Sequence, residues 1–252
     1  MRRLFALLFV SALVVLPVGT ASAKPMVADT LRDVRSGDHG TYERMVLDLG
    51  SSKAPADYTP YYSWARVAGG TVVRIQLPTV DSTLKTDGKG LGGGISRYYV
   101  VREKSGGSMF VDVHLKDTAG PVNVFYLNYP GRIVIDVPTG GSLNPYPKAA
   151  FGKNVVLMQP RAGYIVGPDI FTAEGYGRPF EATGSWRLKD STGAVVSRGS
   201  YKTSDWAETW GRFSFSLDYP ASLGGSSGTL EVGRYSARNG SFEGVSVPLK
   251  FR

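Results

Sequence analysis

The chain of 252 residues contains no cysteine and two histidines, His39 and His114. Without cysteine there are no disulfides, no thiol nucleophile, no Cys-ligated metal and no lipid attachment through a lipobox. The two histidines lack the H-E-x-x-H spacing or a similar arrangement that a zinc amidase uses. A serine hydrolase would need one of them beside a serine on a sharp turn, and we interpret Gly224-Gly-Ser-Ser-Gly228 as a loop between strands. We therefore expect a protein that is not an enzyme, with no catalytic residue, metal or cofactor.

Long apolar runs are also missing after the N-terminus, so no membrane span is expected in the body of the chain. The N-terminus itself has Arg2 and Arg3, a mostly apolar run from Leu4 to Leu16, and the small residues of Ala21-Ser-Ala23. This pattern is typical of a secretory signal peptide, and the alternative is an uncleaved anchor helix. We predict a signal peptide at residues 1–23 and a secreted, extracytoplasmic protein associated with the cell wall or envelope.

Acidic residues are fewer than basic ones, with 21 Asp and Glu against 29 Lys and Arg and a net charge of +8. A basic exported protein is attracted to anionic wall polymers, phospholipid headgroups or acidic glycans. Nucleic acid is not expected as a partner, because the charge is scattered and the compartment is wrong. The alternative is that the excess charge serves solubility alone.

The residues that are abundant indicate an all-β protein, since 32 Gly and 15 Pro accompany many Val, Thr, Tyr and Phe. Apolar and polar residues alternate in several segments, which is typical of strands with one buried face. We predict two β-sandwich domains in tandem, at residues 24–140 and 154–252. Residues 141–153, with Pro145 and Pro147, are predicted to be a semi-stiff linker that spaces two independent domains.

Two segments give specific predictions about facing. In the strand from Met109 to Lys116, every second residue from Met109 is apolar and is expected to face inward, whereas His114 is expected on a polar outer face. In the second half, Trp186 and Leu188 are expected to face the core. The Gly-rich segment 81–96 is expected to be a long loop.

The first half resembles the AMIN and AMIN-like domains. Tyr42-Glu-Arg44-Met-Val-Leu-Asp-Leu49 is similar to the strand that opens these domains, and Pro130-Gly-Arg132-Ile-Val-Ile-Asp136-Val137 is similar to the strand that closes them. AMIN domains are β-sandwiches of periplasmic or wall-associated proteins. The resemblance implies binding to peptidoglycan or another envelope polymer.

The second half resembles Gmad2, the immunoglobulin-like domain of bacterial spore-germination and envelope proteins. The resemblance covers residues 155–251 and implies an immunoglobulin-like sandwich, without implying a reaction. The matching segments are Pro160, Val166-Gly-Pro168, Thr172-Ala-Glu-Gly175, Arg178-Pro-Phe180-Glu181, Leu188-Lys-Asp190 with Gly193, Trp210-Gly-Arg-Phe213 and Val245-Ser-Val-Pro-Leu-Lys-Phe251.

Two functions remain open. The first is a non-catalytic envelope protein whose first domain binds peptidoglycan, another envelope glycan or a related anionic polymer. The second is a structural or protein-interaction component of a cell-wall or spore-germination assembly, with other envelope proteins as partners. For the first function we predict polymer contacts by Arg35, Arg44, Tyr61, Tyr62 and Trp64, because Arg pairs with anionic groups and aromatic rings stack on sugars. The alternative is that Arg44 pairs with Asp48 or Asp136 and that the rings close one end of the sandwich.

Overall fold

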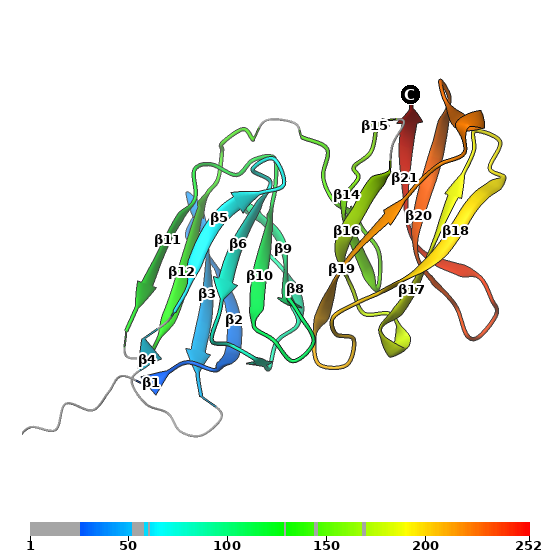
Figure 1. Ribbon diagram of the computed structural model, residues 1–252. Helices are drawn as coiled ribbons and strands as arrows, with labels where there is room; N and C mark the ends of the chain where they lie inside the picture. The colour runs from blue at the N-terminus through cyan, green and yellow to red at the C-terminus, as the bar shows by residue number, and fades with distance from the viewer. Residues whose placement is uncertain (1–25, 52–57, 60, 129, 144–145, 168–169) are drawn as a thin grey trace, which may run out of the picture.

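A computed structural model describes residues 26–51, 58–59, 61–128, 130–143, 146–167 and 170–252. The predicted signal peptide lies outside the described residues. The all-β prediction is confirmed: the described chain folds into two β-sandwiches in tandem, shown in Figure 1. Helical structure in this part of the chain amounts to two 3₁₀ turns, η1 (Phe180–Ala182) and η2 (Ala221–Leu223).

The first sandwich consists of two sheets with a core between them. One sheet has the strand order β11 (Asn123–Leu127), β12 (Arg132–Pro138), β3 (Tyr42–Gly50), β2 (Thr30–Asp38) and β7 (Ser82–Thr83). The opposite sheet has β5 (Ser63–Val67), β6 (Val72–Leu77), β10 (Met109–Leu115) and β9 (Ile95–Arg102), with β8 (Asp87–Lys89) beside β9. A short parallel pair, β1 (Met26–Val27) and β4 (Tyr58–Thr59), lies apart from both.

Alternation along β3 shows why these residues form a strand of a sandwich. Met45, Leu47 and Leu49 are buried in the first core, while the residues between them are half-buried on the outer face. Successive side chains of a strand point to opposite faces, so this sequence places one apolar face inside and one polar face outside.

The second sandwich follows the same plan. One sheet has β13 (Ala150–Phe151), β14 (Val155–Gln159), β16 (Phe171–Gly177) and β19 (Trp210–Leu217) in that order. The other has β15 (Tyr164–Val166), β21 (Phe242–Phe251), β20 (Ser227–Tyr235), β17 (Thr183–Lys189) and β18 (Val195–Lys202). Trp186 and Leu188 of β17 lie in the core between them, as predicted.

The two sandwiches share a sheet. Strand β19 of the second pairs in parallel with β9 of the first, through Trp210 with Val101 and Gly211 with Arg102, so that one nine-stranded sheet runs through both halves. The prediction that a linker spaces the two domains is therefore wrong, because the halves are in direct contact. Where one domain ends and the other begins stays a prediction from the sequence.

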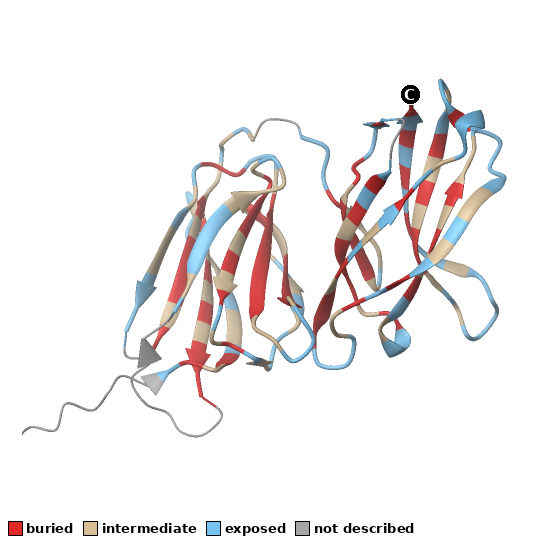
Figure 2. Cartoon of the chain, viewed as in Figure 1, coloured by how far each residue is buried: buried red, intermediate tan, exposed pale blue. Residues whose placement is uncertain are grey.

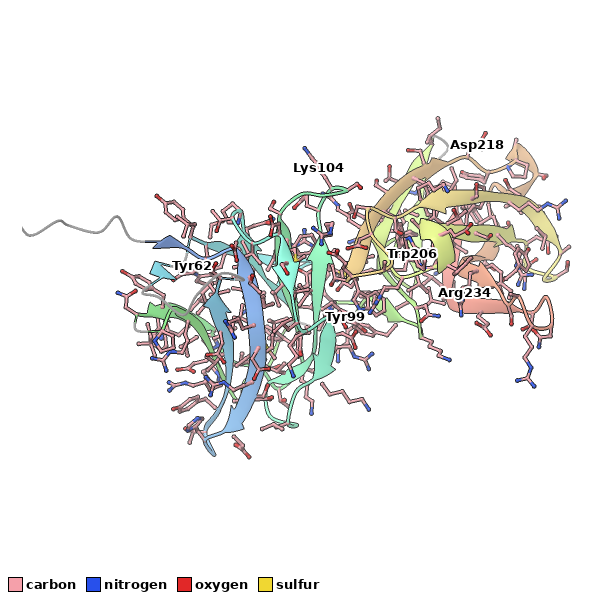
Figure 3. The ribbon with its side chains drawn as sticks, turned by 90° about the horizontal axis from the view of Figure 1, so that it is seen from below. Tyr62, Tyr99, Lys104, Trp206, Asp218 and Arg234 are labelled. Carbon is pink, nitrogen blue, oxygen red and sulfur yellow. The ribbon has the colours of Figure 1, made fainter. Side chains whose placement is uncertain are left out.

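A third core lies between the two halves. Its members from the first half are Val72, Tyr99, Val101 and Phe110, and those from the second include Val156, Met158, Tyr176 and Trp210. Figure 3 places Tyr99 at this junction. These residues belong to the outer faces of β6, β9 and β10 and of β14, β16 and β19, so the outer face of each half-sheet packs against the other.

This junction corrects the prediction for β10. The face that carries Asp112 and His114 was expected to be wet, but every residue of β10 is buried, as Figure 2 shows. Asp112 is fully buried and accepts two hydrogen bonds from Arg74, at 2.7 Å each, and Arg74 lies over the Phe110 ring. The polar residues of β10 are covered because the second sandwich packs on them.

The Gly-rich segment 81–96 is held by a buried carboxylate. Glu43 of β3 accepts hydrogen bonds from the backbone N–H groups of Leu91, at 2.6 Å, and Ile95, at 3.0 Å. A Cβ atom at Gly94 would lie 2.4 Å from a Val137 methyl group. Glycine is required there by the close approach of the loop to β12, and the segment contains the short strands β7 and β8.

Candidate binding site

The predicted arginines lie on the outer face of the first sandwich, and each has a carboxylate partner. Arg35 donates to both oxygens of Asp48, at 2.5 and 2.9 Å. Arg44 donates to both oxygens of Asp136, at 2.7 and 2.8 Å. The Arg44 guanidinium also lies over the Tyr42 ring, 5.4 Å from its centroid. Both arginines use a two-point geometry on the protein itself, and their charge is compensated locally.

The predicted aromatic residues lie at one open edge of the same sandwich. Tyr61 is 61% exposed and Trp64 is 41% exposed, while Tyr62 is half-buried against the core. Tyr62 makes an edge-on contact with Tyr126 of β11, with ring centroids 6.3 Å apart. Tyr126 is 50% exposed, and Figure 1 shows β5 next to β11 and β12 at this side. These four rings, Tyr61, Tyr62, Trp64 and Tyr126, form what we call the aromatic edge.

Strand register explains why these rings gather there. Trp64 pairs with Ile75 and Tyr126 pairs with Ile133, and both isoleucines belong to the first core. Residues opposite each other on paired strands share a face, so Trp64 and Tyr126 face the interior from opposite sheets. They remain half exposed because β5 and β11 are edge strands. Tyr126 is not among the aromatic contacts predicted from the sequence.

A second exposed aromatic pair lies in the second sandwich. Phe180 is 63% exposed and Trp206 is 38% exposed, and their rings meet edge-on with centroids 5.3 Å apart. Next to Phe180, Glu181 and Ala182 have φ values of 53° and 56°, a left-handed conformation that costs free energy for residues other than glycine. Trp210, by contrast, is 4% exposed in the core between the two halves.

The loop that carries Trp206 is organised by one carboxylate. Asp205 accepts hydrogen bonds from the backbone N–H groups of Trp206, Ala207 and Glu208, at 2.6, 3.0 and 3.3 Å. The buried Arg102 of β9 donates to Asp205 at 2.8 Å and to Glu208 at 2.6 Å. Although burial opposes it, these hydrogen bonds hold the pKa of Asp205 below its usual value. A residue of the first sandwich therefore fixes the shape of a surface loop of the second.

The two histidines have packing roles. His39 lies in the turn between β2 and β3 and stacks on Tyr42, with ring centroids 4.7 Å apart. His114 is 3% exposed, bonds the Tyr176 hydroxyl and touches the rings of Tyr99 and Phe151. Burial, and then the positive charge of Arg97, lower the pKa of His114 to about 3.

Two other candidate arrangements for catalysis are a metal site and the serine-containing loop. Among the described residues, no group of three or more His, Asp and Glu side chains could hold a metal ion. The serine-containing loop predicted at residues 224–228 leads from η2 into β20, and the Ser226 hydroxyl donates to the Leu223 carbonyl at 2.5 Å. No helix in the described parts of the chain is long and apolar enough to cross a membrane.

Comparison with known proteins identifies the second half. Residues 154–241 match Gmad2, the immunoglobulin-like domain of bacterial spore germination. This match confirms the resemblance inferred for the second sandwich over residues 155–241, and the closing segment Val245–Phe251 lies beyond it. The match favours a structural or interaction role in the cell envelope. The AMIN-like resemblance of the first half is not supported by a family match and stays a prediction. No curated protein and no solved structure matches the chain.

Proposed function

We propose that this chain is a non-catalytic, exported envelope protein that binds peptidoglycan or a related wall glycan through the aromatic edge. The observation that carries the proposal is the set of half-exposed rings, Tyr61, Trp64 and Tyr126, gathered at an open side of the first sandwich. Sugar rings present C–H faces that pack on aromatic rings, and such sites gain affinity when the rings are already in place. The Gmad2 match supports an envelope location.

The ion pairs of Arg35 and Arg44 make these two arginines weaker candidates for polymer contact than the rings. Arg35 and Arg44 already donate to Asp48 and Asp136, so a polymer anion would have to displace a carboxylate that is held by two hydrogen bonds. Surface pairs of this kind contribute about 1 kcal/mol or less to stability, but they remove the unpaired charge that attracts a ligand. The rings therefore carry the proposed glycan contact, and the contacts by the two arginines stay a prediction.

Binding of the chain from residue 24 to purified sacculi tests the proposal. Trp64→Ala and Tyr126→Ala, made singly, are expected to weaken sacculus binding by about fivefold or more, since one aromatic pair contributes about 1 kcal/mol beyond its buried area. Tyr164→Ala is the matched control, because Tyr164 is an equally exposed tyrosine of the second sandwich, at 49%. Salt is expected to have little effect on a contact made by stacking.

Thermal melting distinguishes binding from structure in the same variants. Both rings also cover the open edge, so a variant that loses binding and melts far below the parent chain would assign the rings to stability alone. Unchanged binding by Trp64→Ala and Tyr126→Ala would contradict the proposed site.

A second function is favoured by the Phe180–Trp206 pair. Exposed aromatic residues on a pre-organised loop are typical of the central contacts in protein interfaces, and left-handed residues that are not glycine are often found at functional sites. This arrangement favours a structural or interaction component of a cell-wall or germination assembly. Under this alternative, Trp206→Ala abolishes capture of a specific envelope protein and leaves sacculus binding unchanged. Loss of capture by Trp64→Ala and not by Trp206→Ala would contradict it.

A further inference from the structure

The outer face of the sheet β21–β20–β17–β18 has an excess of positive charge. Burial alternates along these strands, with Trp186, Leu188, Leu230 and Val232 inside and the residues between them outside. The outward residues include five cations and, among the described residues of these strands, one carboxylate, Glu231. The cations, which together define what we call the cationic face, are Arg187, Lys189, Arg198, Lys202 and Lys250.

Glu231 cannot compensate all of these charges. It accepts from Arg187, at 2.7 Å, and from Lys189, at 2.8 Å, so both of its oxygens are engaged. Arg198 lies directly opposite Arg187 on the neighbouring strand and has no hydrogen bond or ion pair with any described residue. Like charges opposite each other on paired strands are destabilising. Arg187 is compensated by Glu231 and Arg198 is not, so the uncompensated charge of Arg198 indicates a place for an external anion.

The first sandwich provides an internal comparison. On its outer sheet face Arg35 and Arg44 each have their own aspartate, so that face is close to neutral. On the cationic face of the second sandwich, by contrast, several cations have no carboxylate partner. Charge that looks scattered in the sequence is therefore concentrated on one face of the fold.

The outer face beside Arg198 has a row of small residues, some of them serines. Ser185 pairs with Ser200, and Gly233 pairs with Gly244, so a row of small residues crosses the sheet. The Arg187 guanidinium lies 4.2 Å from the Phe242 ring centroid. Alternate residues of a strand are about 7 Å apart and neighbouring strands about 5 Å apart, so Lys189 and Arg198 lie at about these spacings from Arg187, and Lys202 and Lys250 lie farther out.

We infer that the cationic face binds a linear polymer that carries a phosphodiester in each repeat. A planar guanidinium such as that of Arg198 fits two phosphate oxygens, and serine hydroxyls can donate to a third. Several cations spread over a face of four neighbouring strands suit an extended chain of anions more than a single small ion. On this sheet the large exposed apolar residues Val195, Tyr235 and Ile165, which pairs with Lys250 on the edge strand β15, lie at the ends and edge of the face, so its middle has no large apolar side chain to insert into a bilayer.

The inference depends on the proposed envelope role for the source of the polymer, but its test uses no wall material. The probe is long-chain inorganic polyphosphate, with the chain from residue 24 titrated against it at low salt. Arg198→Ala is expected to weaken binding about fivefold, the effect of one cation near an anionic surface, and Arg198→Glu to weaken it further. Binding is expected to weaken as salt rises to physiological strength, because exposed charges are screened.

Lys104 provides the matched control. It is an exposed lysine in the β9–β10 turn of the first sandwich, so Lys104→Ala and Lys104→Glu make the same charge changes away from the cationic face. These controls are expected to change polyphosphate affinity less than twofold. Arg198 is exposed on an edge strand, so its variants are expected to melt like the parent chain.

Three results would overturn the inference. The first is an equal loss of affinity in Arg198→Glu and Lys104→Glu, which would show an effect of net charge alone. The second is no polyphosphate binding at low salt. The third is binding to vesicles of phosphatidylglycerol that polyphosphate does not compete with, which would assign the face to a lipid surface. Trp64→Ala is expected to leave polyphosphate binding unchanged. The proposed glycan site and the proposed cationic face can therefore be refuted separately.

Discussion

Lowering the pH to about 5 is expected to destabilise the junction between the two halves through His114. The imidazole is buried between the sandwiches, bonded to Tyr176 and next to the Tyr99 and Phe151 rings, and the positive charges of Arg97, Arg74 and Arg161 act on it. A neutral ring offers Nε2 as an acceptor for the Tyr176 hydroxyl. A protonated ring carries hydrogen on both nitrogens and adds a fourth positive charge to the site.

The sign and size of the effect follow from linkage. Burial, followed by the charge of Arg97, lowers the pKa of His114 from 6.5 to about 3 in the folded chain. Between these values the unfolded chain binds a proton that the folded chain does not, so the free energy of unfolding falls as pH falls below 6.5. At pH 5 the loss is about 2 kcal/mol, and it keeps growing until the pH approaches the folded value.

Urea denaturation of the parent chain and of His114→Gln, at about pH 7.5 and pH 5, measures this loss. Glutamine can still accept a hydrogen bond from Tyr176 but does not titrate. The parent chain is expected to lose about 2 kcal/mol more than the variant between the two pH values. Equal losses would show that His114 is not buried in neutral form at the junction, and the described packing of β10 against the second sandwich would then be wrong.

Two substitutions test other parts of the packing. Trp186→Ala is expected to cost about 3–5 kcal/mol of unfolding free energy by urea denaturation, because the ring is 9% exposed in the second core; a cost below about 1 kcal/mol would place it on the surface. Arg102→Ala is expected to cost about 3–5 kcal/mol, since it leaves Asp205 buried without its cation, and to change the fluorescence of Trp206 by releasing its loop. An unchanged spectrum with unchanged stability would mean that Arg102 does not organise the loop.

Much of the fold could be predicted because each sandwich encodes its core locally. Alternation in β3 and β17 places Met45, Leu47, Trp186 and Leu188 inside without reference to any other strand. Period-two patterns depend only on the pleat of the strand itself. The Gmad2 resemblance was found from short motifs in order, and the family match over residues 154–241 confirms it.

The junction could not be predicted, because its pattern is the same as that of a wet face. In β10, Asp112 and His114 alternate with apolar residues, as they would on a surface strand. Their burial depends on partners from other strands: Arg74 of β6 bonds Asp112, and Tyr176 of β16 bonds His114. Such partners are set by three-dimensional packing and leave no local signal. For the same reason, the sequence left the partner of Arg44 open between Asp48 and Asp136, and the structure assigns Asp136.

The shared sheet also changes what is expected when the halves are separated. A fragment of residues 24–140 would expose Tyr99, Val101 and Phe110 to water and would lose both carboxylate partners of Arg102. Each large apolar side chain gains about 1.5–3 kcal/mol on burial, so losing the junction costs several kcal/mol. We therefore expect the fragment to melt well below the intact chain and to bind a hydrophobic dye.

The alternative is two independent domains joined by residues 141–153, as the sequence suggested. Independence predicts that limited proteolysis within that segment leaves two fragments that separate on a sizing column and keep the melting behaviour of the intact chain. A docked pair predicts instead that the nicked halves elute together, because the β9–β19 pairing and the core around Tyr99 do not depend on the connecting segment. Separation of folded, dye-free fragments would show that the junction contributes little free energy. Co-elution that is lost on Arg102→Ala would show that Arg102 helps to hold the two sandwiches together.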